Sequence, residues 1–227
     1  MRFLGLLLAA GMTTSVWSQV ICIDPGHPSE NGRGSKGKRL TEVEVAWKVA
    51  VRLRELLKSD GYTVVMTKEE QEETVTNRDR ARIANEAKSD LLLRLHCDAA
   101  SGSGISAYYP KETGRAHGIE GPSEAVRKRS GELAKKFFPA LIASLDGRHK
   151  SRGLMTDRQT AIGNRQGALT GSIFSKVPVI LVELAVLTNP KDEAFLESKQ
   201  GFERLCQALR AGVLAAVPKT GGTKPAR

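Results

Sequence analysis

The 227-residue sequence has little cysteine and no periodic repeat. Its three cysteines are too few for a small fold held together by disulfides. The 22 glycines and nine prolines follow no fixed period, which argues against a solenoid. Beyond the first twenty residues no apolar run has membrane length, which excludes a polytopic membrane protein. Hydrophobic residues at 40% and charged residues at 26% are typical of a globular protein with a sizeable core.

Positive charge exceeds negative charge in this sequence. The 35 Lys and Arg residues against 25 Asp and Glu residues give a formal net charge of +10. A basic surface favours a polyanionic partner, such as nucleic acid, an anionic membrane face or an acidic wall polymer. Charge alone does not choose among these partners.

Residues 1–18 are typical of a secretory signal peptide. Arg2 supplies a positive charge, residues 3–12 form an apolar run, and small residues precede a predicted cleavage after Ser18. The alternative is a buried first helix, but strand-like residues follow at once without a helix cap. We therefore expect export to the periplasm, or else to the cell surface or medium, which argues against a nucleic-acid partner. We expect no stable membrane insertion of the mature chain.

Strand-like and helical segments alternate along the rest of the chain. Short apolar segments predict strands at residues 19–24, 62–67, 91–95, 105–109 and 179–182. Helical periodicity predicts helices at residues 41–59, 77–87, 123–145 and 192–217, the last interrupted at Gly201. Residues 148–170 are expected to be irregular. This order predicts one α/β domain over residues 19–218, a mostly parallel twisted sheet with helices on both faces, followed by a disordered tail at residues 219–227.

Three of the predicted strands end at an ionisable residue. His27 follows the first strand, His96 follows the third, and Glu183 ends the last. The carboxyl ends of parallel strands meet at one edge of a sheet, where sites of α/β proteins gather. We therefore expect these three side chains to lie close together.

Two histidines with a carboxylate, and no thiolate, favour a catalytic zinc ion with an open position. The third ligand is expected at the start of the helix after the Gly-rich loop, where Glu42 and Glu44 lie two residues apart. Only one of them can serve, because they point in different directions around the helix. Glu183 has apolar neighbours, so its carboxylate must be paired, metal-bound or raised in pKa, and it could act as a base.

Each of these residues also has a purely structural interpretation. A single His after a strand is more often a hydrogen-bonded loop residue than a metal ligand. Glu42 could simply be favoured by the helix dipole, and Glu183 could be a buried salt-bridge partner. Four such residues at one predicted sheet edge are harder to explain in this way. His117 and His149 lie in polar, Gly-containing segments and are expected to be solvated.

The three cysteines fit no metal-binding pattern. Cys22 and Cys97 fall on or beside strands that could be neighbours, so they form either a disulfide or two buried free thiols. Cys206 lies on the last predicted helix and is expected in the core.

Six motifs occur in a fixed order along the chain. They are D-x-G-H at residues 24–27, Glu42 eight residues before Ala50, R-x-x-x-A-N at residues 80–85, an S-x-H-x-N-like segment at residues 94–98, P-x-x-L-V-E at residues 178–183, and an S-N-P-like segment at residues 188–190. Together they resemble the motifs of the zinc-dependent N-acetylmuramoyl-L-alanine amidases of bacterial cell walls, the amidase_3 type. The resemblance covers roughly residues 20–217.

This resemblance implies that His27, Glu42 and His96 bind one zinc ion and that Glu183 is the catalytic carboxylate. It also favours Glu42 over Glu44. The implied reaction is hydrolysis of the amide between N-acetylmuramic acid and the L-alanine of the stem peptide in peptidoglycan.

The chain departs from the family pattern at three positions. Val43 stands where Lys is usual, Arg94 where Ser is usual, and Asp98 where Asn is usual. The loop at residues 101–122 and the segment at residues 166–172 resemble features of a subgroup. These departures leave open the exact wall substrate and any regulation, including a blocking loop or a protein activator.

Other interpretations stay open. Arg158, Arg165 and Lys176 lie near the final strand and could bind stem-peptide carboxylates, although a solvated face is the simpler role. The chain could be another zinc peptidase acting on wall peptides, or a non-catalytic zinc-containing protein that binds the wall or regulates its turnover. Glu183 argues against the non-catalytic alternative, because binding alone needs no base.

Overall fold

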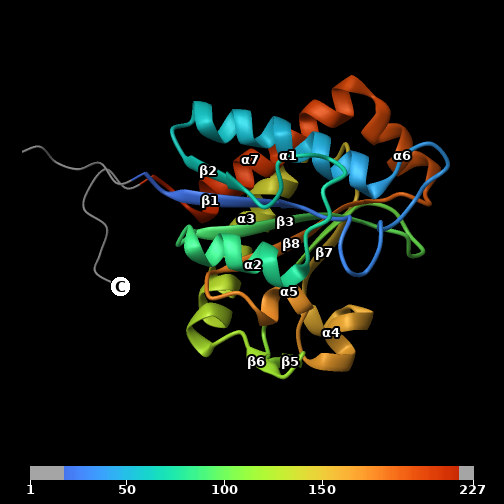
Figure 1. Cartoon of the computed structure of the whole chain (residues 1–227). Coiled ribbons are helices and arrows are strands. Elements are labelled where there is room, and N and C mark those ends of the chain that lie inside the picture. The colour runs from blue at the N-terminus through green and yellow to red at the C-terminus, as the bar shows by residue number, and fades with distance from the viewer. Residues whose placement is uncertain (1–17, 220–227) are drawn as a thin grey trace, which may run out of the picture.

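Strands and helices alternate along the chain in the computed structural model, which describes residues 18–219 (Figure 1). The strands are β1 (Val20–Pro25), β2 (Thr63–Met66), β3 (Leu91–Asp98), β4 (Ile105–Tyr109), β5 (Gly114–Ala116), β6 (Ile119–Gly121), β7 (Ser151–Thr156) and β8 (Val179–Val186). The helices are α1 (Glu42–Ser59), α2 (Asn77–Glu86), α3 (Glu124–Leu145), α4 (Ala161–Gln166), α5 (Thr170–Ile173), α6 (Pro190–Glu197) and α7 (Lys199–Ala216), with a 3₁₀ turn at Asp157–Gln159. The predicted signal peptide, except Ser18, and the tail beyond Lys219 lie outside the described residues.

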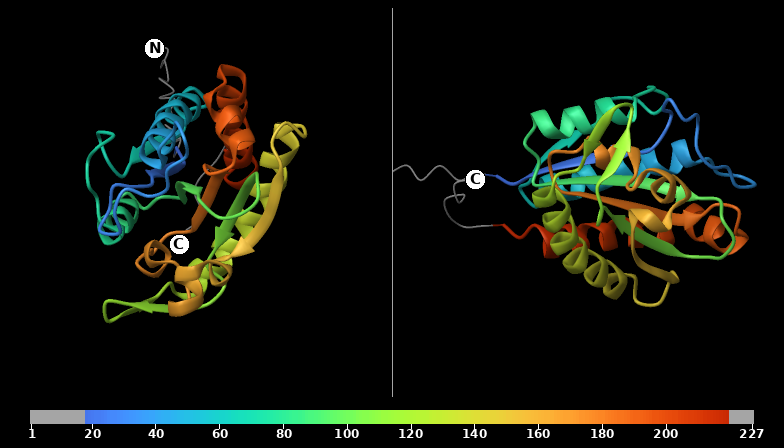
Figure 2. Two further views of the ribbon diagram at one scale, coloured as in Figure 1. Left: turned by 90° about the vertical axis from the view of Figure 1, so that its right-hand side faces the viewer. Right: turned by 90° about the horizontal axis from the view of Figure 1, so that it is seen from below.

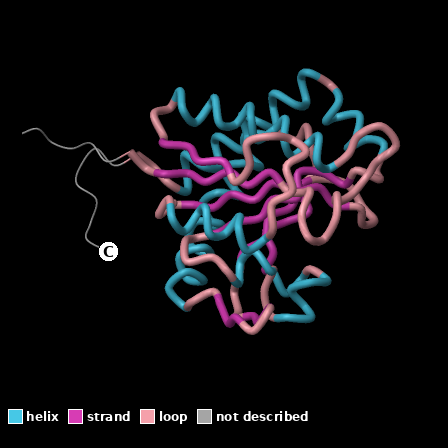
Figure 3. The backbone as a smooth tube through the Cα atoms, in the orientation of Figure 1, coloured by secondary structure: helices cyan, strands magenta, loops and turns pink. Residues whose placement is uncertain are grey.

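A six-stranded sheet with the order β2-β1-β3-β8-β4-β7 runs through the middle of the described chain (Figure 3). Every neighbouring pair is parallel except β4 and β8, which are antiparallel. A separate hairpin joins β5 to β6. The arrangement confirms the predicted α/β fold with a mostly parallel sheet.

Helices cover both faces of this sheet. Alternate residues of β1 divide between two cores, because successive strand side chains point to opposite faces. Ile21 and Ile23 join the larger core, which also holds residues of α1, α3 and α7, whereas Cys22 joins a smaller core with Ala84 of α2. Figure 1 shows α1 above the sheet and α2 below it, and the left view of Figure 2 looks onto the edge where β1 ends.

The helix termini follow the side-chain caps that the sequence supplies. Thr41 caps α1, and its hydroxyl accepts a hydrogen bond from the backbone N–H of Glu44 at 3.4 Å. Ser198 caps α7 in the same way, accepting from the N–H of Gly201 at 2.9 Å. The single helix predicted over residues 192–217 is therefore wrong: the break lies at the extended residue Ser198, and Gly201 belongs to the first turn of α7.

The prediction that residues 148–170 are irregular is also wrong. They contain β7, which pairs with β4 at the edge of the sheet, and the short helix α4. The sequence of β7 has no apolar alternation because an edge strand is only partly buried. Of the helices among residues 18–219, none is long and apolar enough to cross a membrane.

All three cysteines are buried free thiols. Cys22 packs in the smaller core and Cys97 in the larger one. The disulfide alternative is therefore wrong, because the two side chains lie on opposite faces of the sheet. Cys206 lies in the larger core, as predicted.

Candidate metal centre

His27 lies in the turn that follows β1. The N–H of Gly26 donates to the carbonyl of Leu95 at 2.8 Å, which ties the turn to β3. His27 has a left-handed backbone, with φ 55°, and its Nδ1 lies 2.9 Å from the carbonyl oxygen of Gly32. A carbonyl oxygen only accepts, so Nδ1 carries the proton and Nε2 is left to bind a metal.

Glu42 is the first residue of α1, and its side chain is only 3% exposed. Its Oε2 accepts a hydrogen bond from the N–H of Ser35 at 2.6 Å, and its Oε1 accepts one from the N–H of Cys97 at 3.1 Å. These bonds link the carboxylate to the Gly-rich loop on one side and to β3 on the other. The orientation of Glu42 is therefore fixed before any ligand binds.

The three predicted ligands converge at the carboxyl edge of the sheet. Nδ1 of His96 lies 2.9 Å from Oε1 of Glu42, and Nε2 of His27 lies 3.6 Å from the same oxygen. Each residue offers one ligand atom, and these atoms all lie within 4.8 Å of one another. The structure thus brings together His27, Glu42 and His96, which lie far apart in the sequence.

The geometry fits a small divalent ion. Ligand atoms bound tetrahedrally to zinc at about 2.0–2.1 Å lie roughly 3.3–3.5 Å from one another, close to the 3.6 Å between Nε2 of His27 and Oε1 of Glu42. Nε2 of His96 is buried and has no hydrogen-bond partner within residues 18–219. A Cβ at Gly26 would meet the His96 ring, and one at Gly34 would meet Glu42 and His27, so both glycines leave space that the ligands fill. The role of the three residues as metal ligands stays a prediction.

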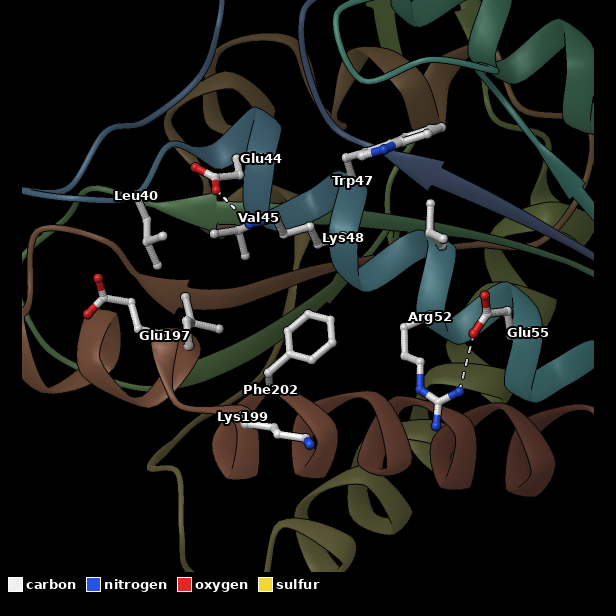
Figure 4. Close-up of a pocket in the computed structure, with 12 residues that line it drawn as sticks. Leu40, Glu44, Val45, Trp47, Lys48, Arg52, Glu55, Glu197, Lys199 and Phe202 are labelled. Atoms are coloured by element: carbon white, nitrogen blue, oxygen red, sulfur yellow. Dashed lines mark hydrogen bonds and ion pairs between the residues drawn. The ribbon is translucent and has the colours of Figure 1, made fainter.

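Glu44 points away from this centre. Its carboxylate pairs with Lys48 at 2.7 Å on the outer side of α1. There it lines a groove of about 760 Å³ between α1 and the α6–α7 segment, together with Trp47 and Phe202 (Figure 4). Only one of the two glutamates at this helix start therefore faces the histidines, and it is Glu42.

Glu183 lies on β8 directly beside His96. The two residues are partners in the parallel register of β3 and β8, so their side chains leave the sheet on the same face. Oε2 of Glu183 is buried and has no hydrogen-bond partner in the described part of the chain. Burial, followed by the charges of Glu42 and Asp98, raises the pKa of Glu183 well above its ordinary value. An unpartnered carboxylate with a raised pKa suits a group that accepts a proton near neutral pH.

The ligand residues titrate in the directions that metal binding requires. Burial would raise the pKa of Glu42, but the hydrogen bond from His96, the charges of His96 and His27 and the hydrogen bond from Ser35 together outweigh it, and the pKa falls to about 2. Burial lowers the pKa of His96 and so favours the neutral imidazole. An ionised carboxylate and a neutral imidazole are the forms that bind a metal ion.

Residues 21–215 match the profile of the Amidase_3 family, described as N-acetylmuramoyl-L-alanine amidase. The chain belongs to this family. Among similar sequences, the N-acetylmuramoyl-L-alanine amidase LytC of Bacillus subtilis (strain 168) is 28% identical over 211 residues, which are 92% of this chain and 37% of LytC. The probable cell wall amidase LytH of Staphylococcus aureus is 28% identical over 201 residues, which are 86% of this chain and 57% of LytH. The chain thus spans well under two thirds of the length of either relative.

Solved amidase structures share the fold. The CwlD amidase from Clostridioides difficile, solved in complex with the GerS lipoprotein, superposes with a TM-score of 0.66 and 18% identity over 86% of this chain and 96% of CwlD. At this identity the likeness shows the fold alone, and it confirms the α/β architecture predicted for the amidase family.

A second group of buried charges supports the metal centre of this amidase-family chain. Asp24 is fully buried and accepts hydrogen bonds from Arg80, from Nε of Arg94 at 2.7 Å and from the hydroxyl of Thr67 at 2.6 Å. Arg80 also donates to the carbonyl of Pro28 at 2.9 Å, next to His27. Asp24, Arg80 and Arg94 lie in the motifs of the sequence, but the motifs alone assign them no role. The sequence does hint at a structural role for Arg94, because this charged residue interrupts a strand that is predicted to be buried.

The two remaining histidines lie outside the metal centre. His117 is exposed, as predicted, and its ring stacks on Phe174 at 6.2 Å. The prediction that His149 is solvated is wrong: it is buried, its Nε2 donates to the carbonyl of Leu184 at 3.0 Å, and its ring stacks on Phe195 at 4.5 Å. A hydrogen-bonded imidazole between β8 and α6 is compatible with burial because its polar atom is paired.

The three cations proposed as carboxylate clamps are exposed. Arg158 pairs with Glu112 at 3.3 Å and donates to the carbonyl of Asn164 at 3.0 Å. Arg165 lies near the end of α4, and Lys176 lies between α5 and β8. Their role in binding stem peptides stays a prediction.

Proposed function

We propose that this chain hydrolyses the amide between N-acetylmuramic acid and the L-alanine of the stem peptide in peptidoglycan. One observation carries the proposal: the ligand atoms of His27, Glu42 and His96 converge within 4.8 Å beside Glu183, whose Oε2 is buried and has no hydrogen-bond partner among residues 18–219. Membership of the amidase family supports this reading of the cluster.

Zinc is the metal that we propose for His27, Glu42 and His96, because two imidazoles and a carboxylate form a common hydrolytic zinc site. Bound there, zinc would lower the pKa of a water molecule to about 7 and polarise the amide carbonyl.

Glu183 is the catalytic carboxylate in this proposal. It accepts a proton from the attacking water while the water oxygen bonds to the lactyl carbonyl carbon. It then donates that proton to the nitrogen of L-alanine as the carbon–nitrogen bond breaks. The products are the lactyl carboxylic acid of the sugar and a free peptide amine, so atoms and charge balance; the proton of the acid then passes to the amine or to solvent.

The remaining sequence predictions belong to the same proposal. We infer export by a signal peptide at residues 1–18, a catalytic domain at residues 19–218 and a tail at residues 219–227. The periplasm is the proposed location, and peptidoglycan is the proposed substrate. The complex of the CwlD amidase with a lipoprotein supports a protein partner for this chain, which we propose as an activator.

The decisive experiment is digestion of purified peptidoglycan, with and without a chelator, followed by mass spectrometry. We expect stem peptides beginning with L-alanine, released only without chelator. Cleavage inside the stem would instead identify a zinc peptidase. Binding to the sacculus without any released product would identify a non-catalytic wall-binding protein.

Two glutamate variants control this experiment. Glu183→Ala should abolish product release while zinc still binds, because the residue acts on the proton and is not a ligand. Glu44→Ala should leave product release unchanged, because Glu44 lies on the far side of α1 and pairs with Lys48. Full activity of Glu183→Ala would contradict the assignment of the base.

A further inference from the structure

Two cations lie close enough to Glu183 to lower its pKa electrostatically, Arg152 and Arg94. Arg94 is 4% exposed, with Nε bonded to Asp24 at 2.7 Å and Nη2 bonded to Asn77 at 2.7 Å. Gly171 of α5 packs against its third nitrogen, Nη1, so closely that a Cβ there would meet it. Arg94 therefore belongs to the fold and has little to offer a ligand.

Arg152 differs because its side chain is 20% exposed. The pairing of β7 with β4 passes from Ser151 to Gly153, so Arg152 is an extra residue in β7. Gly153 has a φ of 106°, a conformation that suits glycine at such a bulge. A β-bulge redirects a side chain relative to the regular alternation of a strand, and bulges are frequent beside active sites.

Asp98 holds the redirected Arg152 in place. Nη1 of Arg152 donates to Oδ2 of Asp98 at 2.7 Å. The other carboxylate oxygen accepts from the N–H groups of Ala99 at 2.7 Å and Ala100 at 2.9 Å, so Asp98 is itself fixed. A guanidinium carries five N–H donors in a rigid fork, and one anchored nitrogen leaves the others to bind a second carboxylate.

The carboxylates at this edge favour such a cation. Glu183 and Asp98 both lie there, and a carboxylate repels an anionic substrate. Wall stem peptides carry carboxylates, so a cation beside Glu183 and Asp98 would favour their binding. Arg152 is the partly exposed cation that acts on Glu183.

The position of β7 indicates which substrate group Arg152 can reach. β7 is separated from β8 by β4 alone. Two strand spacings are about 10 Å, whereas an extended peptide advances about 3.5 Å per residue. With the scissile amide beside Glu183, Arg152 and its long side chain are in reach of the second stem residue.

We propose that Arg152 binds the α-carboxylate of the acidic second residue of the stem peptide and selects stems in which this group is free over stems in which it is a carboxamide. The proposal rests on the proposed function, since that function places the scissile amide at Glu183.

The test uses two muramoyl dipeptides that differ in one group. N-acetylmuramoyl-L-alanyl-D-glutamate has the free α-carboxylate, and N-acetylmuramoyl-L-alanyl-D-isoglutamine has the carboxamide. We expect kcat/KM to favour the acid by about tenfold, the scale of one charge-assisted hydrogen bond that the amide cannot make. In Arg152→Met the ratio should fall to about one, and Arg152→Lys, which keeps the charge without the fork, should give an intermediate ratio.

The ratio of the two kcat/KM values is insensitive to partial unfolding, because both dipeptides are measured on the same protein sample. Arg210→Met is the matched control, since Arg210 forms a similar pair with Asp60 at 2.6 Å away from the proposed site. It should keep the preference of the unchanged protein. If Arg152→Met keeps the full preference, or if the unchanged protein shows none, the proposal is overturned.

A binding measurement separates this proposal from the proposed function. Calorimetry on Glu183→Gln compares the affinities for the two dipeptides without turnover. Tighter binding of the acid that is lost on adding Arg152→Met supports the subsite, even if the unchanged protein cuts neither dipeptide. Cleavage of both dipeptides with equal kcat/KM supports the amidase and refutes the subsite.

Discussion

Two clusters of ionisable side chains lie at the carboxyl edge of the sheet and differ in whether all their polar atoms have partners. The anchor cluster, Asp24, Arg80 and Arg94, is closed, because the aspartate accepts hydrogen bonds from both arginines. Burial would raise the pKa of Asp24, but the charges of the two arginines and the hydrogen bonds from Thr67 and Arg94 together hold it well below its ordinary value. The metal cluster, His27, Glu42 and His96, is open. Nε2 of His96 has no partner among residues 18–219, and neither has Oε2 of Glu183 beside it.

This difference distinguishes side chains that stabilise the fold from side chains that are available to bind a ligand or to react. A buried charge without a partner costs several kcal/mol, so such a group calls for an explanation such as a bound ligand or a role in catalysis. The closed cluster holds the turn that carries His27, because Arg80 bonds the backbone of Pro25 and Pro28. Changes in the two clusters should therefore affect different properties.

The largest effect is expected from removing one side chain of the metal cluster. His96→Ala removes a ligand, so metal content should fall to background and turnover should drop by about 10³-fold or more. Elemental analysis and the peptidoglycan digest measure the two quantities. Unchanged zinc in this variant would contradict the ligand set.

Breaking the anchor cluster should instead unfold the protein more easily. Arg80→Met leaves the charge of Asp24 buried with one partner fewer, which should lower the free energy of unfolding by about 3–5 kcal/mol. Urea denaturation measures it. Arg82→Met on the same helix, which removes an exposed pair with Glu86, should cost less than about 1 kcal/mol. Equal effects of the two substitutions would refute the anchoring role.

A smaller effect is expected where the backbone approaches the metal cluster. A methyl group at Gly34 would meet Glu42 and His27, so Gly34→Ala should weaken zinc affinity by about 10–100-fold. Gly32 also has a positive φ, 96°, but a Cβ there meets nothing within 4 Å. Gly32→Ala therefore introduces the same kind of backbone strain as Gly34→Ala without the steric contact, and it should keep the zinc affinity. A competition titration with a chromophoric chelator compares the two, and equal losses would show that strain alone is responsible.

The smallest effect is a change in how stability depends on pH. The pKa of Asp24 is depressed in the folded protein, so its stabilising contribution is present above the unfolded pKa of about 3.9 and is lost as pH falls below it. Urea denaturation between pH 6 and pH 3 should show stability falling at up to about 1.4 kcal/mol per pH unit from this group. Asp24→Asn should be less stable at pH 6 but flatter over this range. Parallel curves for the two proteins would refute the linkage.

The sequence was sufficient for the residues that follow buried strands. His27, His96 and Glu183 could be placed together because parallel strands end at a common edge, and the choice of Glu42 followed from the helix start and the family resemblance. These inferences need only strand order and direction.

Features that depend on contacts between distant segments could not be predicted from strand order and direction. β7 is a polar edge strand whose bulge at Arg152 hides any alternation, and Ser198 ends one helix and caps the next without a break in composition. His149 is buried because the carbonyl of Leu184 accepts its proton, a contact between segments 35 residues apart. The closed pairing of Asp24 likewise depends on three separate segments.

Anomalous diffraction at the zinc absorption edge, on crystals of the zinc-loaded protein, is the sharpest test that His27, Glu42 and His96 bind zinc. We expect one strong peak about 2.0–2.2 Å from an atom of each of these three residues, with Glu183 nearby but unbound. A peak at other residues, or none in crystals of protein that still releases stem peptides, would contradict it.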